Sequence, residues 1–148
     1  MTCVEGTTVV SQLSRGEIGV PAAGHDDYLP AASLQMISSV VHRPNAGPCW
    51  ILRIVGGVDS RTSGELLSTI ERLLGADHLS HLILGLDGVA RMDSSGVGAL
   101  VAGLRDCQEQ HVRFTLCGLP KSIRDMLERT RLAGLFEVRL TVEEALRR

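Results

Sequence analysis

The chain has 148 residues, the size of one ordinary domain; 44% are hydrophobic and only 3% aromatic, so an aliphatic core is expected. A formal net charge of −2 gives no basic surface for nucleic acid. No run of about 18 apolar residues and no basic-then-apolar N-terminus occurs, so neither a membrane span nor a secretory signal is predicted, and a cytoplasmic location is expected.

Residues 1–30 lack the hydrophobic periodicity of the remainder. Their net charge is −3, from Glu5, Glu17, Asp26 and Asp27 against Arg15, so residues 31–148 carry +1. We predict that residues 1–30 form a mobile tail, with an edge strand near Thr7–Leu13 as the alternative. Residues 31–148 are predicted to form one domain.

The first regular segments predict a hairpin. SLQMISSVVH (33–42) alternates and is rich in β-branched residues, which predicts a strand. CWILRIVG (49–56) predicts a second strand. The RPNAGP segment between them has the composition of a turn, so the two strands should pair in antiparallel fashion.

A change of period predicts a helix over Thr62–Leu74. Its apolar residues share one helical face: Leu66, Leu67, Ile70, Leu73 and Leu74. Thr62 and Glu65 fit a capping box, and Gly75 should end the helix.

Strands and helices then alternate to the C-terminus. HLILGL (81–86) predicts a strand covered on both faces, ended by Asp87. Further strands are predicted over 112–118, with Val112, Phe114 and Leu116 inward, and over 136–140. Three more helices are indicated by the apolar faces 97–107 and 123–130 and by VEEALRR, for which Thr141 and Glu144 form a capping box. This order predicts a single α/β domain with a mostly parallel sheet.

The segment MDSSGVG (92–98) places a carboxylate and two adjacent hydroxyls where a strand gives way to a helix. Such a helix start has N–H groups without intrahelical acceptors. The segment lacks the lysine of a phosphate loop, the glycine spacing of a dinucleotide loop and the G-x-S-x-G pattern of a nucleophile elbow. These enzyme classes are therefore not predicted, and simple capping of the helix by Asp93 or the serines is the plainest alternative.

Two metal-dependent sites are also disfavoured. A phosphoaspartate site at Asp87 would need an acid pair after the first strand, where residues 41–43 are Val-His-Arg. His78 and His81 form an H-x-x-H pair with only Asp77 at ligand spacing, so a polar turn is favoured over a metal site.

The cysteines are expected to be free thiols in a reducing compartment. None of the four, Cys3, Cys49, Cys107 and Cys117, forms a C-x-x-C pair. No metal or other cofactor is expected.

Three stretches, in order along the chain, resemble STAS domains and specifically the anti-sigma factor antagonists. LDGVAR followed by MDSSGVGAL (86–100) resembles the serine motif of the family, VGGVDSRTSGEL (55–66) its entry into the first helix, and LAGLFEV with TVEEAL (132–146) its C-terminal elements. The chain departs from the family at Gly57 and Val58, where an acid and a leucine or isoleucine are common. The resemblance implies a STAS-like domain with an N-terminal hairpin and helices packed mainly on one face.

The resemblance implies a partner-switching protein that is not an enzyme. Unphosphorylated, it would bind an anti-sigma factor serine kinase and release a sigma factor for transcription; the kinase would phosphorylate Ser94, the serine after the motif Asp, and a phosphatase would reset it. Ser95 is the second choice, because local chemistry does not separate the two hydroxyls. Partner contacts are expected at Asp59, Ser60, Met92, Asp93, Ser95 and Gly96.

Within the turn, Asp93 and Ser95 are expected to set the geometry, with Ser95 capping the helix, while free N–H groups accommodate a phosphate. Gly96, Gly98 and Gly103 lower helix propensity, which predicts close approach of this helix to the sheet or to a partner. The alternative function is a non-switching STAS module that binds a small ligand or nucleotide, or serves as a subunit of a regulatory or transport complex. A weak homodimer is a further option.

Overall fold

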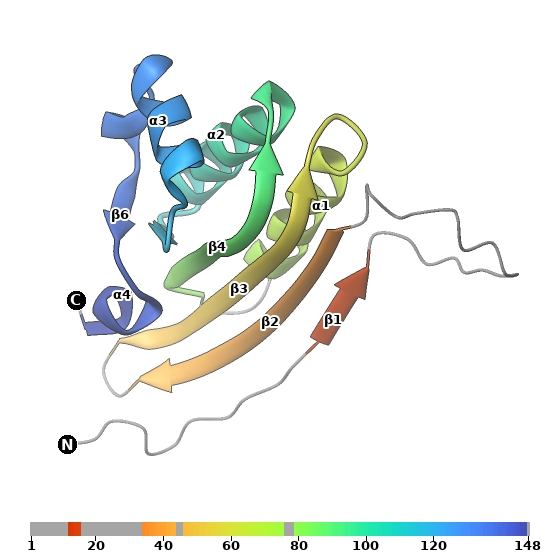
Figure 1. Ribbon diagram of the computed structural model, residues 1–148. Coiled ribbons are helices and arrows are strands. Elements are labelled where there is room, and N and C mark those ends of the chain that lie inside the picture. The colour runs from red at the N-terminus through yellow and green to blue at the C-terminus, as the bar shows by residue number, and fades with distance from the viewer. Residues whose placement is uncertain (1–11, 16–33, 44–45, 76–78, 148) are drawn as a thin grey trace, which may run out of the picture.

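A six-stranded sheet forms the centre of the computed structural model, which describes residues 12–15, 34–43, 46–75 and 79–147 (Figure 1). The strands lie in chain order: β1 (Gln12–Arg15), β2 (Leu34–Arg43), β3 (Gly47–Val58), β4 (His81–Met92), β5 (Arg113–Cys117) and β6 (Glu137–Arg139). The pairs β1–β2 and β2–β3 are antiparallel, and the three pairs from β3 to β6 are parallel. The predicted hairpin and mostly parallel sheet are confirmed.

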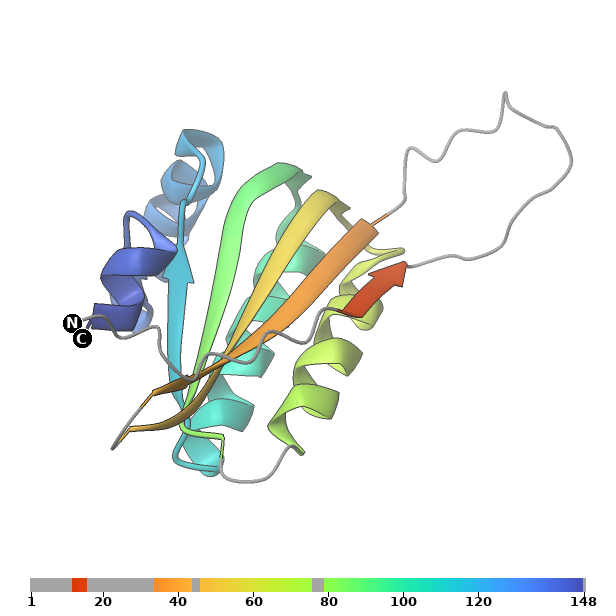
Figure 2. The same cartoon turned by 90° about the horizontal axis from the view of Figure 1, so that it is seen from below.

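The helices alternate with the strands along the chain from β3 onwards, and most of them pack on one face of the sheet, as predicted. They are α1 (Ser63–Leu74), α2 (Ser94–Glu109), α3 (Lys121–Arg129), the 3-10 helix η1 (Ala133–Leu135) and α4 (Val142–Arg147). Figure 2 shows α1 and α2 side by side along one face, and the buried residues of α3 join the same core. The short α4 packs on the opposite face. None of the helices in the described part of the chain is long and apolar enough to cross a membrane.

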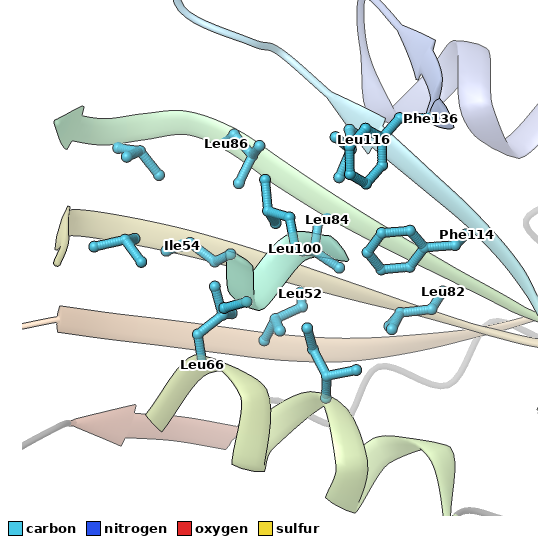
Figure 3. Close-up of a cluster of buried hydrophobic side chains, with 14 of the residues drawn as sticks. Leu52, Ile54, Leu66, Leu82, Leu84, Leu86, Leu100, Phe114, Leu116 and Phe136 are labelled. Carbon is cyan, nitrogen blue, oxygen red and sulfur yellow. The ribbon is translucent and has the colours of Figure 1, made fainter. Parts of the chain in front are cut away.

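The main core is aliphatic and fixes the distance between α1, α2 and the sheet. Alternate residues of three neighbouring strands point into it: Leu52, Ile54, Leu82, Leu84, Leu86, Phe114 and Leu116 (Figure 3). Leu66 of α1 and Leu100 of α2 meet them from the helical side, both fully buried. Burial of each such side chain stabilises the fold by about 1.5–3 kcal/mol.

Strand β4 is longer than predicted. The sequence predicted a strand over 81–86 that Asp87 ends, but β4 continues along β3 to Met92. Two register shifts relative to β3 change the spacing of the residues that face the main core from two to three, so that Val89 and Met92 follow Leu86 at intervals of three. A bulged strand of this kind lacks the alternation that identifies strands in sequence. The extension matters because it carries the strand end up to the serine turn.

Thr62 does not cap α1, so the predicted capping box with Glu65 is wrong. The Thr62 hydroxyl donates to the carbonyl oxygen of Gly57 at 2.9 Å and accepts from the N–H of Asp59 at 3.0 Å. Its side chain thus closes the turn between β3 and α1 instead of accepting from the helix. For α4 the Thr141 half of the predicted capping box is confirmed, since the N–H of Glu144 donates to Thr141 Oγ1 at 3.1 Å. The Glu144 side chain accepts from the N–H of Leu140 at 3.1 Å, one residue before the cap.

Four residues of the segment predicted as a tail form a strand. Gln12–Arg15 pair with residues 35–38 of β2, as an edge strand that overlaps the alternative prediction at residues 12–13. The other residues of 1–30 lie outside the described part of the chain, so their mobility stays a prediction.

His81 is buried and hydrogen-bonded inside the sheet. Its Nε2 lies 2.8 Å from Thr115 Oγ1, and Thr115 donates to Glu137 Oε1 at 3.2 Å. Because that hydroxyl gives its proton to the carboxylate, it accepts its second hydrogen bond from Nε2–H of His81. Burial first, and then the charge of Arg113, lowers the pKa of His81 to about 4.

The part of the chain that the structure describes contains no cluster of side chains suited to a metal ion. His78 lies outside the described residues, and within them no group of three or more His, Cys, Asp or Glu side chains could hold a metal ion. Cys49, Cys107 and Cys117 are buried free thiols, and Cys3 lies outside the described part. Burial raises the pKa of Cys107 to about 12, so this thiol is unreactive at neutral pH.

We expect His81 to make the fold less stable in mild acid, by about 2 kcal/mol between pH 7.5 and pH 5. Its pKa rises from about 4 in the folded chain to 6.5 on unfolding. The unfolded chain therefore takes up the proton first, and the stabilisation is complete above pH 6.5 and lost as the pH falls towards 4. Urea unfolding at both pH values should show a smaller loss for His81→Gln than for wild type. An equal loss in the two proteins would contradict this assignment.

Candidate functional site

Two turns meet at the carboxyl ends of β3 and β4 (Figure 1). One leads through Asp59 into α1, and the other through Asp93 into α2. The strands stay paired to their last residues, Val58 beside Met92. The N–H of Asp93 donates to the carbonyl oxygen of Val58 at 3.1 Å, which ties the second turn to the first. Two segments distant in sequence thus form one surface at the carboxyl-terminal edge of the sheet, where β3 and β4 end.

Asp93 is the N-cap of α2. It has extended backbone geometry, with φ −108° and ψ −168°, and its Oδ1 accepts from the N–H groups of Ser95 at 2.9 Å and Gly96 at 3.2 Å. A carboxylate in this position also interacts favourably with the positive end of the helix dipole. The prediction that the Ser95 hydroxyl caps the helix is therefore wrong, because the aspartate occupies that role.

Removal of this cap gives a matched pair of variants. Asp93→Ala should lower the free energy of unfolding by about 1–2 kcal/mol, because two N–H groups lose their acceptor. Asp93→Asn keeps an acceptor oxygen and should lose much less, since Asn and Asp are comparable N-caps. Urea unfolding measures both. Equal losses in the two variants would show that the charge, rather than the hydrogen bonds, holds the turn.

The two serines differ in exposure. Ser94, the first residue of α2, is exposed, and Ser95 is half-buried. No hydrogen bond within the described residues uses the Ser94 hydroxyl. An external active site therefore reaches Ser94 more easily than Ser95.

The first turn of α2 has few N–H groups free to bind an anion. Asp93 takes the N–H groups of Ser95 and Gly96, and its carbonyl oxygen accepts from Val97 at 3.1 Å. Of the first-turn donors, only the N–H of Ser94 has no acceptor among the described residues. The expectation that several free N–H groups would hold a phosphate is thus wrong. A phosphate on Ser94 would lie beside the Asp93 carboxylate.

Met92 and Gly96, both predicted as partner contacts, lie inside the fold. Met92 is only 6% exposed, and Gly96 is buried against it. A Cβ on Gly96 would lie 2.5 Å from Met92 Cγ and 3.0 Å from the carbonyl oxygen of Val58. The glycine therefore allows α2 to begin directly against the ends of β3 and β4. In this structure both residues position the turn from its buried side, where α2 meets the strand ends.

The Asp59 turn adds a second carboxylate to the same surface. Asp59 Oδ1 accepts from the N–H of Arg61 at 2.8 Å, and this hydrogen bond is the main cause that lowers the pKa of Asp59. The side chain is half-buried and Ser60 is exposed. Val58 and Thr62, which the sequence did not assign to the site, hold the two turns in place, Val58 through its carbonyl oxygen and Thr62 through its hydroxyl. A backbone carbonyl such as that of Val58 leaves no signature in sequence, and the Thr62 hydroxyl was assigned to a helix cap instead.

The fold and the turn define an α/β domain that presents an exposed serine, an aspartate cap and a second acidic turn at one sheet edge. The model of the STAS domain family matches residues 39–145, well over half of the chain, and the chain belongs to this family. The sequence-based assignment to the family is confirmed. A curated relative, an anti-sigma F factor antagonist from Paenibacillus polymyxa, is 23% identical over 88 residues, which is 60% of this chain and 73% of the relative.

Solved structures share the fold. The anti-sigma factor antagonist SpoIIAA from Bacillus, in its phosphorylated form, is 21% identical with a TM-score of 0.53, over 66% of this chain and 87% of that one. The murine anion transporter Slc26a9 is 16% identical with a TM-score of 0.58, over 66% of this chain but only 17% of the transporter. At these identities the likeness establishes the fold alone.

Proposed function

We propose that this protein is an anti-sigma factor antagonist that switches partners through phosphorylation of Ser94. Unphosphorylated, it binds an anti-sigma factor that is also an ATP-dependent serine kinase, and so releases a sigma factor. The observation that carries the proposal is the exposed Ser94 hydroxyl, directly after the Asp93 cap and at the edge that also bears Asp59. The P. polymyxa relative, by its name, and the phosphorylated SpoIIAA structure support it.

Phosphorylation changes binding without unfolding the domain. The phosphate adds roughly −1.5 to −2 charges to an exposed side chain on which no packing depends. At a docked interface this charge must lose water beside the carboxylate of Asp93, at a cost of about 3–5 kcal/mol if it remains unpaired. Binding to the kinase is lost and the fold persists, which makes the switch reversible.

The protein acts in this scheme as a kinase substrate and binding module in the cytoplasm, and not as an enzyme. No hydrogen bond in the described part of the chain joins Ser94 or Ser95 to a general base, so neither hydroxyl is activated as a nucleophile from within the chain. A phosphatase acting on phosphoserine completes the cycle.

Capture followed by phosphorylation tests the proposal. Immobilised wild type and Ser94→Glu are incubated with an extract of the host, and retained proteins are identified by mass spectrometry. Wild type should retain a serine kinase that Ser94→Glu does not, and the purified kinase should phosphorylate Ser94 with ATP. Equal retention by both proteins, or failure of the kinase to label wild type, would contradict the proposal.

We expect Asp59→Asn to weaken kinase binding without lowering stability. The amide keeps the oxygen that accepts from the N–H of Arg61 at 2.8 Å, so the turn should persist, while the exposed edge loses one negative charge. Titration calorimetry with the purified kinase and thermal unfolding separate the two effects. A lower unfolding temperature with unchanged affinity would assign Asp59 a purely structural role.

A pocket on the α4 side of the sheet, the face opposite to α1 and α2, favours the alternative function, a non-switching STAS module that binds a small ligand. It has a volume of about 190 Å³ and is lined by residues of three strands and the start of α4, among them Arg53, Asp87, Cys117 and Glu143. Its lining does not include the serine turn, so a substitution in that turn tests the switching function without changing the pocket. Under the alternative, replacement of Ser94 would change no binding property of the protein.

A further inference from the structure

Helix α2 contains three glycines, and the packing of this chain requires only two of them. A Cβ on Gly96 would lie 2.9 Å from Val58 Cγ1, as well as close to Met92. A Cβ on Gly103 would lie 2.9 Å from Ile70 Cδ1 and 3.7 Å from Phe114 Cζ. Both glycines therefore allow α2 to approach its neighbours closely, one at the strand ends and the other at α1 and the sheet.

Gly98 has no such role. It is exposed, and a Cβ built on it would meet no atom outside its own helix within 4 Å. Its backbone is ordinary helix, whereas the described glycines with positive φ are Gly47, Gly56 and Gly118. Neither packing nor backbone conformation within the described residues thus explains a residue that weakens a helix relative to alanine.

The position of Gly98 suggests what does explain it. It follows Ser94 by four residues, so both lie on the same face of α2, one turn apart, and both are exposed. A kinase that transfers phosphate to the Ser94 hydroxyl must bring its own surface over this face. Without a side chain at residue 98, that surface can contact the helix backbone directly.

We propose that Gly98 is a contact residue of the kinase interface, where its missing side chain sets how closely the kinase approaches Ser94. The inference rests on the proposed function and adds a residue that determines partner fit. It predicts an unusual combination: the alanine variant is more stable than wild type and a poorer kinase substrate.

The test compares wild type, Gly98→Ala and Gly98→Leu with the purified kinase identified in the capture experiment. By helix propensity Gly98→Ala should raise the unfolding temperature by about 2–5 °C. Steric overlap at the interface should weaken its binding to the kinase by about tenfold and slow phosphorylation of Ser94, and Gly98→Leu should abolish both. Gly134→Ala is the matched control, because Gly134 is also exposed with nothing within 4 Å of its Cβ, and it should bind as wild type.

Wild-type binding and phosphorylation of both Gly98 variants would overturn this inference and leave the proposed function standing. A lower unfolding temperature for Gly98→Ala would also overturn it, by showing that the glycine serves this fold. If wild type itself neither bound the kinase nor became phosphorylated, the proposed function would fail and the inference with it.

Discussion

Ser94→Ala should lose all phosphorylation by the kinase and remain bound to it in the presence of ATP. The hydroxyl is exposed and makes no hydrogen bond within the described residues, so its removal should leave the free energy of unfolding within about 0.5 kcal/mol of wild type. Ser94→Glu should also fold normally but bind the kinase at least about tenfold more weakly, because one charge must be desolvated at the interface. Calorimetry and thermal unfolding measure the two properties separately.

Ser95→Ala is the control for this pair. The cap is the Asp93 carboxylate, so loss of the neighbouring hydroxyl should change the free energy of unfolding by less than about 0.5 kcal/mol and should not stop phosphorylation. The sequence alone suggested a loss of about 1 kcal/mol, on the assumption that Ser95 caps α2. A loss of that size would mean that the serine shares the cap with Asp93.

Gly96→Ala should produce the largest loss of stability among the variants at this edge, about 1–3 kcal/mol. The new Cβ would lie 2.5 Å from Met92 Cγ and 3.0 Å from the backbone oxygen of Val58. Met92 is buried and the carbonyl belongs to a paired strand, so α2 must move away from the sheet. That movement should also displace Ser94 and slow its phosphorylation.

Gly64→Ala is the matched control for Gly96→Ala. Gly64 lies in the first turn of α1 at the same edge, but it is exposed and its Cβ would meet nothing within 4 Å. Urea unfolding should show no loss for this variant, and a small gain is expected from helix propensity. Equal stability of the Gly96 and Gly64 variants would mean that α2 tolerates a side chain at the strand ends.

Much of the fold could be predicted because its periodicity is regular. The alternation in 33–42, the helical face that includes Leu66 and the capping box of Thr141 with Glu144 all correspond to observed elements. The end of β4 could not be predicted, because two register shifts change the spacing of its core-facing residues from two to three. Thr62 was misassigned because a threonine before a helix can close the preceding turn as easily as cap the helix.

The candidate site could be predicted only in part, because its details depend on which residues meet in space. The sequence located the serine turn, since a carboxylate and two hydroxyls follow a predicted strand and precede a predicted helix. It could not show which of Asp93 and Ser95 accepts from the helix, because both side chains can do so. Nor could it separate Gly96 from Gly98, because only Gly96 lies against residues at the ends of β3 and β4.

Phosphopeptide mapping tests the central claim most directly. Wild type, Ser94→Ala and Ser95→Ala are incubated with the purified kinase and ATP, digested and analysed by mass spectrometry. The account predicts phosphate on Ser94 in wild type and in Ser95→Ala, and none in Ser94→Ala. Phosphate on Ser95, or undiminished labelling of Ser94→Ala, would contradict it.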